Sequence, residues 1–464
     1  MLVRLALAAA LLLPAALPLA TAGADPVADR VAGAARVVEQ GAAGLAAACR
    51  RDTPADDAQC AAVPLSPAVS EQAVAGYEQS ALHRTLALQQ ALGDDLPLRF
   101  APWIGTHNSF NASAQAATPS QLDANQQLAL TDQLRLDVRS LELDAHWFPS
   151  LAAHGAPAPV LCHARGADEG HAGCTTERLL VDGLTEVARW LRAHPREVVL
   201  LYLEDHLEAD DGYAAGARAV TAALGDLLYA PRGTACTPLP LDLTRSAVRA
   251  AGKQVVVMSS CHSGAGWNGV VFDDGERSRN EVGPAGYGED GRSCDPRRAP
   301  TAPDVGAGGQ PFDRSLVRVF EDSTALSANL DGPAEALTPA RVAALTRCAV
   351  DITGFDQLLP GDGRLAALVW TWAEGQPGAG GCAVQGRSGR WSSAPCGSTR
   401  AVACRTAAGA WSVAEGRCRT GAFAVPRYGW EGVQLAAAMA AAGVTEVAVA
   451  LRLQGGRWVP LDRR

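Results

Sequence analysis

Polar side chains of the kinds that carry chemistry follow four short apolar stretches of the sequence. A histidine and an asparagine come directly after 101–106, two carboxylates close 138–144, a histidine closes 159–163 and a glutamate closes 197–204. These six residues are His107, Asn108, Glu142, Asp144, His163 and Glu204. Each has an ordinary explanation when taken alone, because surface loops often contain histidines and acidic residues. Their ordered repetition at the ends of successive predicted strands instead indicates one functional site.

The chemistry of these side chains points to a metal ion with a proton-transfer pair beside it. Glu142 and Asp144 are two residues apart, so both carboxylates lie on the same face of a strand. Three carboxylates directed at one pocket repel one another unless a cation neutralises them. Carboxylate and amide oxygens are hard ligands that favour Ca²⁺ over Zn²⁺. The two histidines flanking such a cation can exchange protons with a substrate.

The stretches that carry these residues alternate with helical patterns along the chain. Helices are expected at 121–134, 179–194, 338–349 and 432–442, and the third has Thr338 as N-cap and Pro339 at its first position. Strands are expected at 101–106, 138–144, 159–163, 197–204, 254–259, 316–321, 366–372 and 445–451. Eight strands in alternation with helices predict an α/β fold of the TIM-like (β/α)8 barrel type. In such a barrel the C-terminal ends of the strands converge on one pocket.

The other segments define the expected domain organisation. Residues 1–24 have the charge, apolar run and small residues of a signal peptide, which predicts a secreted protein. Residues 25–95 are expected to form a helical N-terminal extension and residues 96–464 the barrel. Long connections at about 260–315 and 373–431 are expected to be insertions on the C-terminal face, because both follow strands. The formal net charge of −9 provides no basic surface for nucleic acid.

The chain contains 12 cysteines, an even number that predicts disulfides in an exported protein. The expected pairs join cysteines that are close in the sequence, and two of the pairs would staple the insertion at 373–431. They are Cys49 with Cys60, Cys162 with Cys174, Cys382 with Cys396, and Cys404 with Cys418. The sequence leaves the pairing of the other four open, namely Cys236, Cys261, Cys294 and Cys348.

The motifs THNSFN (106–111), ELD (142–144) and EDH (204–206), together with His163, resemble the phosphatidylinositol-specific phospholipases C. The resemblance is to their calcium-dependent branch, which has secreted bacterial and fungal members, and it runs from about residue 82 to the last predicted strand. It implies that His107 and His163 are the catalytic pair, with Glu142 as a candidate base. It also implies that Ca²⁺ is held by Asn108, Glu142, Asp144 and Glu204. The metal-independent branch has an arginine at the place matching Asp144, so the acid there favours the calcium form.

The function implied by this resemblance is a secreted, monomeric phosphodiesterase that acts on phospholipid at a membrane surface. It would cleave phosphatidylinositol, or its glycan derivatives, to diacylglycerol and inositol phosphate through a cyclic intermediate. Two alternatives stay open. A glycerophosphodiesterase or a sphingomyelinase-D-like enzyme also places a histidine, an E-x-D pair and a second histidine on successive barrel strands. A secreted lipid-binding or carbohydrate-binding protein without catalysis is the other, although it has no need of two facing histidines.

Overall fold

The computed structural model describes residues 69–114, 124–171, 174, 178–274, 281–282, 316, 318–323, 336–348 and 350–461. The predicted signal peptide, most of the predicted extension 25–95 and the expected Cys49–Cys60 pair lie outside these residues. Within the described part of the chain, no helix has both the length and the apolar character needed to cross a membrane.

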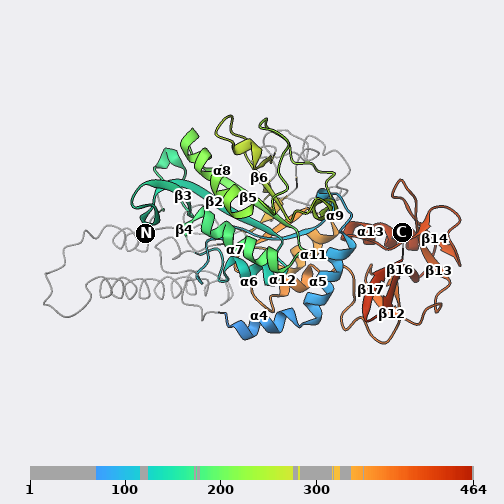
Figure 1. The fold of residues 1–464 in the computed structure, drawn as a ribbon. Helices are drawn as coiled ribbons and strands as arrows, with labels where there is room; N and C mark the ends of the chain where they lie inside the picture. Colours follow the sequence, from blue (N-terminus) through green and yellow to red (C-terminus); the bar gives the residue numbers. More distant parts are fainter. Residues whose placement is uncertain are drawn as a thin grey trace.

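A curled parallel sheet forms the centre of the molecule, as an open half-barrel (Figure 1). Its strands run in the order β7-β6-β5-β2-β1-β10-β9-β8, and every neighbouring pair in this series is parallel. The strands are β1 (Trp103–Thr106), β2 (Ser140–Pro149), β5 (Val199–His206), β6 (Val255–Ser259), β7 (Phe272–Asp273), β8 (Glu281–Val282), β9 (Arg318–Phe320) and β10 (Ile352–Phe355). The mixed α/β class and the barrel-like parallel sheet therefore agree with the prediction.

Helices accompany this sheet: α6 (Leu130–Arg135), α7 (Leu180–Ala193), α8 (Asp210–Leu224), α9 (Arg245–Ala250), α11 (Pro339–Arg347) and α12 (Gly363–Ala367). The sequence of α7 buries Leu180, Leu184, Val187 and Leu191, the spacing of one helical face. The predicted cap of α11 is confirmed, because the Thr338 hydroxyl accepts a hydrogen bond from the Arg341 amide at 3.2 Å. Two more helices, α4 (Glu71–Glu78) and α5 (Ala81–Leu92), precede β1.

Three predicted barrel strands have a different structure, and two of them lie next to the parallel sheet. The segment 159–163 is the end of β3 (Pro157–Leu161), which runs antiparallel to the outer part of β2 and pairs with β4 (Arg178–Leu179), so it is a hairpin strand and not a barrel strand. The segment 366–372 is not a strand: it contains the end of α12 and an irregular turn. Its apolar pattern arises because Leu368, Trp370 and Trp372 are buried in hydrophobic cores.

The predicted helix at 121–134 is also corrected. Residues 121–123 lie outside the described chain, and residues 124–129 are not helical, so that α6 begins only at Leu130. A side chain of this segment instead binds the backbone at the ends of two strands. Gln126 donates hydrogen bonds to the carbonyls of His107 and Phe355, at 2.7 Å each.

A second sheet forms the C-terminal part of the molecule, at the right of Figure 1. The order of its main strands is β12-β11-β16-β13-β14, with β15 added to β13 and β17 to β16. Its strands are β11 (Cys382–Gly386), β12 (Trp391–Ala394), β13 (Ala401–Arg405), β14 (Trp411–Glu415), β15 (Ala422–Phe423), β16 (Glu446–Gln454) and β17 (Arg457–Pro460). The prediction of 445–451 as a barrel strand is therefore wrong, because β16 pairs within this sheet. The segment 373–431 contributes five strands to it, and helix α13 (Gly429–Ala441) follows.

Helix α5 connects the two parts of the molecule. Leu86 belongs to the core of the half-barrel, whereas Leu92 belongs to the core of the second sheet. Between them, the Gln89 side chain donates to the carbonyl of Leu368 at 3.1 Å and accepts from the amide of Trp370 at 2.8 Å. One helix thus packs into both hydrophobic cores.

Disulfides are present in both parts: those of the half-barrel join loops, and those of the second sheet each join a strand to a loop. The predicted pairs Cys162–Cys174, Cys382–Cys396 and Cys404–Cys418 are confirmed. The structure also joins two of the cysteines whose pairing was open, Cys236 and Cys261. No cysteine in the described part of the chain is free.

Candidate active site and metal centre

Three of the predicted carboxylates meet at the C-terminal ends of β2 and β5. Glu142, Asp144 and Glu204 each offer an oxygen, and these oxygens lie within 4.8 Å of one another. Asp144 and Glu204 are direct partners in the parallel register of the two strands, so the sheet itself places their side chains next to each other. Glu142 is two residues before Asp144 and shares its face of β2. The carboxylate cluster predicted from the sequence is therefore present in space.

The cluster fits a hard cation. Glu142 and Asp144 are buried, with 6% and 4% of the residue surface exposed. The Oε1 atom of Glu142 is buried and has no hydrogen-bond partner. A buried carboxylate oxygen without a donor is costly unless a cation or proton satisfies it. Clustered oxygen ligands of this kind suit Ca²⁺.

His107, at the end of β1, is held by an acidic residue that follows β10. Its Nδ1 lies 3.2 Å from Oδ1 of Asp356, and the Asn108 amide lies 3.3 Å from its Nε2. Burial lowers the pKa of His107, but the charge and hydrogen bond of Asp356, with further help from Glu142 and Asp322, outweigh it and raise the pKa to about 10. The imidazole is therefore a buried cation close to the carboxylate cluster.

The two predicted catalytic histidines are joined through a pair of asparagines. Asn111 lies 3.1 Å from Nδ1 of His163 and donates to Oδ1 of Asn125 at 2.8 Å. Asn125 in turn donates to Asp356, the partner of His107, at 3.2 Å. The structure thus brings His163, which follows the hairpin strand β3, and His107 into one hydrogen-bonded site.

The turn after β1 is shaped by its own side chains. Asn108 has φ of 43°, in the left-handed region that residues other than glycine seldom occupy. The Ser109 hydroxyl accepts from the Glu142 amide at 2.9 Å, and the Ser109 amide donates to the Glu142 carbonyl at the same distance. These two bonds tie the turn to β2. They fix the backbone of the predicted ligand Asn108 beside that of the predicted ligand Glu142.

A buried ion pair binds the backbone of Asp356. Glu321, which is fully buried, pairs with Arg364 and accepts a hydrogen bond from the Asp356 amide at 2.7 Å. Burial raises the pKa of Glu321 to about 7, although Arg364 acts in the opposite direction. Arg364 also donates to the carbonyl of Asp356 at 3.0 Å. The backbone of Asp356 is therefore held at both its amide and its carbonyl.

Three residues of this site were not singled out from the sequence: Asp356, Asn125 and Asn111. Asp356 directly follows the short stretch ITGF (352–355), as the predicted site residues follow short strands, and that weak pattern was the available signal. Asn111 belongs to the motif THNSFN, which gave it no individual role. Asn125 has no signal of its own, because it acts through contacts with residues distant in the sequence.

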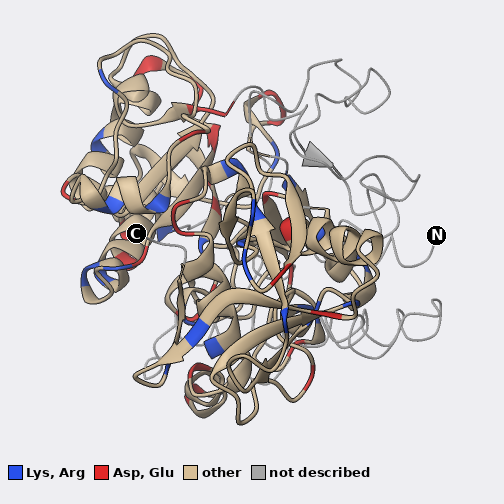
Figure 2. Cartoon of the chain, turned by 90° about the vertical axis from the view of Figure 1, so that its right-hand side faces the viewer, with Lys and Arg blue, Asp and Glu red and all other residues tan. Residues whose placement is uncertain are grey.

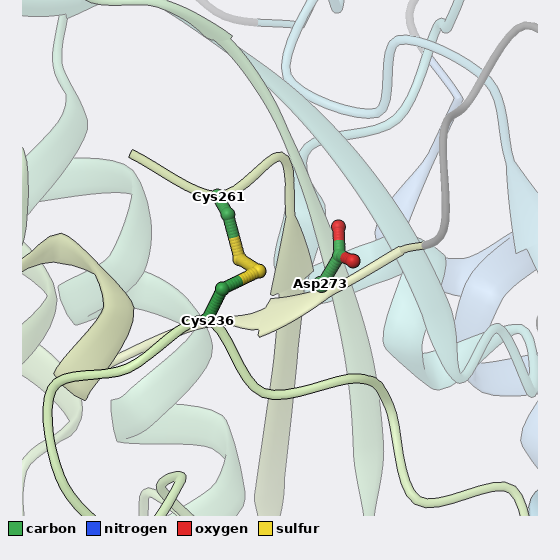
Figure 3. Close-up of side chains that lie close together, drawn as sticks. All are labelled: Cys236, Cys261 and Asp273. Atoms are coloured by element: carbon green, nitrogen blue, oxygen red, sulfur yellow. A yellow bond between two sulfur atoms is a disulfide. The ribbon is translucent and has the colours of Figure 1, made fainter. Parts of the chain in front are cut away.

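Another group of potential metal ligands includes a disulfide and is therefore poorly suited to a metal. Cys236, Cys261 and Asp273 come together beside β6 and β7 (Figure 3). Because the two sulfurs form a disulfide, they offer no thiolate to a metal.

Charged residues of both signs are interspersed over the view of Figure 2.

Comparison with known proteins relates the chain to a described family. The family model of the Rv2075c PI-PLC-like domain matches residues 62–362. Two proteins of Mycobacterium tuberculosis, the uncharacterized proteins Rv2075c and MT2135, are each 43% identical over 392 residues, which cover 80% of this chain and 77% of theirs.

Among solved structures, the phosphatidylinositol-specific phospholipase C from Listeria monocytogenes is 17% identical, with a TM-score of 0.39 and coverage of 62% of this chain and 98% of that one. A variant of the enzyme of the same name from Staphylococcus aureus is 11% identical, with a TM-score of 0.40 and coverage of 62% of this chain and 99% of that one.

Proposed function

Because the chain belongs to the Rv2075c PI-PLC-like domain family, we propose that it is a calcium-dependent phosphodiesterase that cleaves phosphatidylinositol or its glycan derivatives. The products would be diacylglycerol and an inositol phosphate formed through a cyclic intermediate. The inositol 2-hydroxyl would attack phosphorus, the bond from phosphorus to the glycerol oxygen would break, and water would then open the cyclic phosphate.

The observation that carries this proposal is the arrangement of two kinds of groups in one site. The carboxylates of Glu142, Asp144 and Glu204 lie within 4.8 Å of one another, and His107 and His163 are linked beside them by Asn111 and Asn125. A cation site next to two histidines suits the transfer of a phosphoryl group between hydroxyls. A binding protein without catalysis has no need of this combination.

The four oxygen ligands in the proposal are Asn108, Glu142, Asp144 and Glu204. The chemistry supplied at these residues by bound Ca²⁺ is that of a Lewis acid, which neutralises phosphate oxygens and lowers the pKa of a nearby hydroxyl. Glu142 would accept the proton of the attacking hydroxyl, since the raised pKa of His107 leaves its imidazole protonated. The buried imidazolium of His107, oriented by Asp356, would stabilise the charge of the phosphorane.

His163 would act as the general acid for the leaving glycerol oxygen. Its Nδ1 is in contact with Asn111, so Nε2 would be the nitrogen that transfers the proton. General acids of this kind typically contribute about 10² to 10⁴ in rate.

We further propose that the protein is exported and acts as a monomer at a membrane surface. The signal-like residues 1–24 and the disulfides of the described chain support export, because disulfides persist in oxidising compartments.

The test is turnover of phosphatidylinositol vesicles by the purified mature protein, with Ca²⁺ and with excess EGTA. We expect release of diacylglycerol that EGTA abolishes and added Ca²⁺ restores. The exposed acid Asp242 provides a control, since Asp242→Asn should leave turnover unchanged. Hydrolysis of glycerophosphodiesters or sphingomyelin in place of phosphatidylinositol would contradict the proposed substrate, and EGTA-resistant turnover would contradict the proposed metal.

A further inference from the structure

The hairpin of β2 and β3 continues past the carboxylate cluster and ends in an exposed apolar turn. At about 3.4 Å per residue, β2 extends roughly 17 Å from Asp144 to its end at Pro149. Beyond that end, Leu151 is 72% exposed, more than any other large apolar side chain in the described part of the chain. The hairpin lies at the left of Figure 1, at the opposite end of the molecule from the C-terminal sheet. It therefore projects from the C-terminal end of a strand that carries the site.

This hairpin has no formal charge. Residues 145–164 contain no Asp, Glu, Lys or Arg, although 19% of the whole chain is charged. The exposed side chains of the turn are those of Leu151, Ala152, His154, Ala156 and Pro157. Apolar groups gain free energy when they leave water, whereas a charged group would lose it against hydrocarbon. The composition of the turn therefore suits contact with lipid.

The backbone of the turn satisfies most of its N–H groups internally. Five amides donate to carbonyls of the same turn at 2.8 to 3.1 Å, namely those of Ser150, Ala153, His154, Gly155 and Ala156. Pro149 and Pro157, which are partners in the hairpin register, have no N–H group. Backbone groups without hydrogen bonds are what make a loop costly to place against lipid. This turn carries few of them.

The base of the hairpin is fixed on both faces. Trp147 lies against α8, where a Cβ atom added at Gly212 would be 3.1 Å from Cγ of the indole. Phe148, which points to the opposite face, packs with Cys162, and Cys162 forms a disulfide with Cys174. A turn that is already held in place loses little conformational entropy when it binds.

We propose that the turn between β2 and β3, with Leu151 at its tip, inserts into the surface of a lipid bilayer and holds the carboxylate site beside it. This inference rests on the proposed action on phospholipid, which makes a bilayer the occupant of the apolar turn. A second protein chain is disfavoured as a strand partner, because Pro149, Pro157 and Pro159 remove N–H groups from the outer part of the hairpin. Since the hairpin has no formal charge, insertion depends on apolar contact and not on the charge of the lipid.

The test is binding of the purified mature protein to sucrose-loaded phosphatidylcholine vesicles, measured by sedimentation in excess EGTA. We expect binding that changes little between about 0.1 M and about 1 M salt, because salt screens only electrostatic attraction. Leu151→Asp should weaken vesicle affinity by about 10-fold to 100-fold, which corresponds to the burial of one leucine side chain. Leu151→Trp should bind more tightly, since tryptophan favours membrane interfaces. The matched control is Leu453→Asp, because Leu453 is 40% exposed on β16 of the C-terminal sheet and should not affect binding.

This measurement is separate from catalysis, because phosphatidylcholine is not the proposed substrate and EGTA removes Ca²⁺. Binding through Leu151 without turnover of phosphatidylinositol would contradict the proposed function and support the membrane contact. Circular dichroism of each variant identifies loss of the fold, and tighter binding by Leu151→Trp cannot result from misfolding. The proposal is overturned if the unmodified protein does not bind the vesicles or is released by high salt. It is also overturned if Leu453→Asp weakens binding as much as Leu151→Asp, or if both folded Leu151 variants bind as the unmodified protein does.

Discussion

Substitution of Asp144 by asparagine should stabilise the calcium-free protein and weaken its response to calcium. The carboxylate oxygens of Glu142, Asp144 and Glu204 lie within 4.8 Å of one another. Two like charges at that separation repel by about 3.5 kcal/mol at an effective dielectric constant of about 20. Asp144 takes part in two such pairs, so its charge opposes folding when no cation is bound.

Solvation by water relieves much of this repulsion. The gain expected for Asp144→Asn is therefore the range typical of stabilising substitutions, about 0.5–2 kcal/mol, or a few degrees in melting temperature. In Ca²⁺ the order of the two stabilities should change, so that the unmodified protein is the more stable one. Ligand at a concentration about 100 times its Kd stabilises by about 2.7 kcal/mol, and each tenfold loss of affinity removes about 1.4 kcal/mol of that.

The assay is thermal unfolding of both proteins in EGTA and in a series of Ca²⁺ concentrations, with the exposed Asp242→Asn as control. Asp144→Asn should melt above the unmodified protein in EGTA and gain less from Ca²⁺, whereas Asp242→Asn should follow the unmodified protein in both. If Asp144→Asn melts lower in EGTA and keeps the full calcium response, the carboxylates do not form a cation site.

Three further predictions concern catalysis, pH and disulfides. His163→Ala should cripple turnover of phosphatidylinositol but spare a substrate with a nitrophenol leaving group, whereas His107→Ala should damage both; equal losses on both substrates would refute the division of roles. The hydrogen bond to Asp137 raises the pKa of His83 against the effect of burial. Its stabilising contribution should then be complete below the unfolded value near 6.5 and disappear as pH rises through the raised folded value. The loss of unfolding free energy in His83→Gln should accordingly be larger at pH 5.5 than at pH 9 in urea titrations, and a loss independent of pH would contradict this. Thiol titration of the denatured, unreduced protein should find few or no free thiols, and four or more would refute the disulfide framework; each bridge typically contributes about 2–4 kcal/mol.

The sequence alone predicts those strands whose own residues form a clear apolar pattern. Segments such as 197–204 and 254–259 are continuous apolar runs, because central parallel strands are buried on both faces. They became β5 and β6 nearly as predicted. The carboxylate cluster followed from this, since parallel register places the ends of neighbouring strands together.

The failures have a common physical origin in long-range pairing. The runs 366–372 and 445–451 are apolar because they pack into cores, and nothing local distinguishes a buried turn or a strand of another sheet from a barrel strand. In contrast, β10 is only four residues long and contains a threonine and a glycine, so its pattern is weak. Asp356 was missed with it, and so was the link between the two histidines.

The position of α5 has a consequence for how the molecule unfolds. Leu86 is part of one hydrophobic core and Leu92 of the other, and Gln89 binds the backbone that leads into the second sheet. Melting of either core would uncover one end of this helix and withdraw packing from the other core. We therefore expect the half-barrel and the C-terminal sheet to unfold together, and removal of either would expose apolar surface on the part that remains.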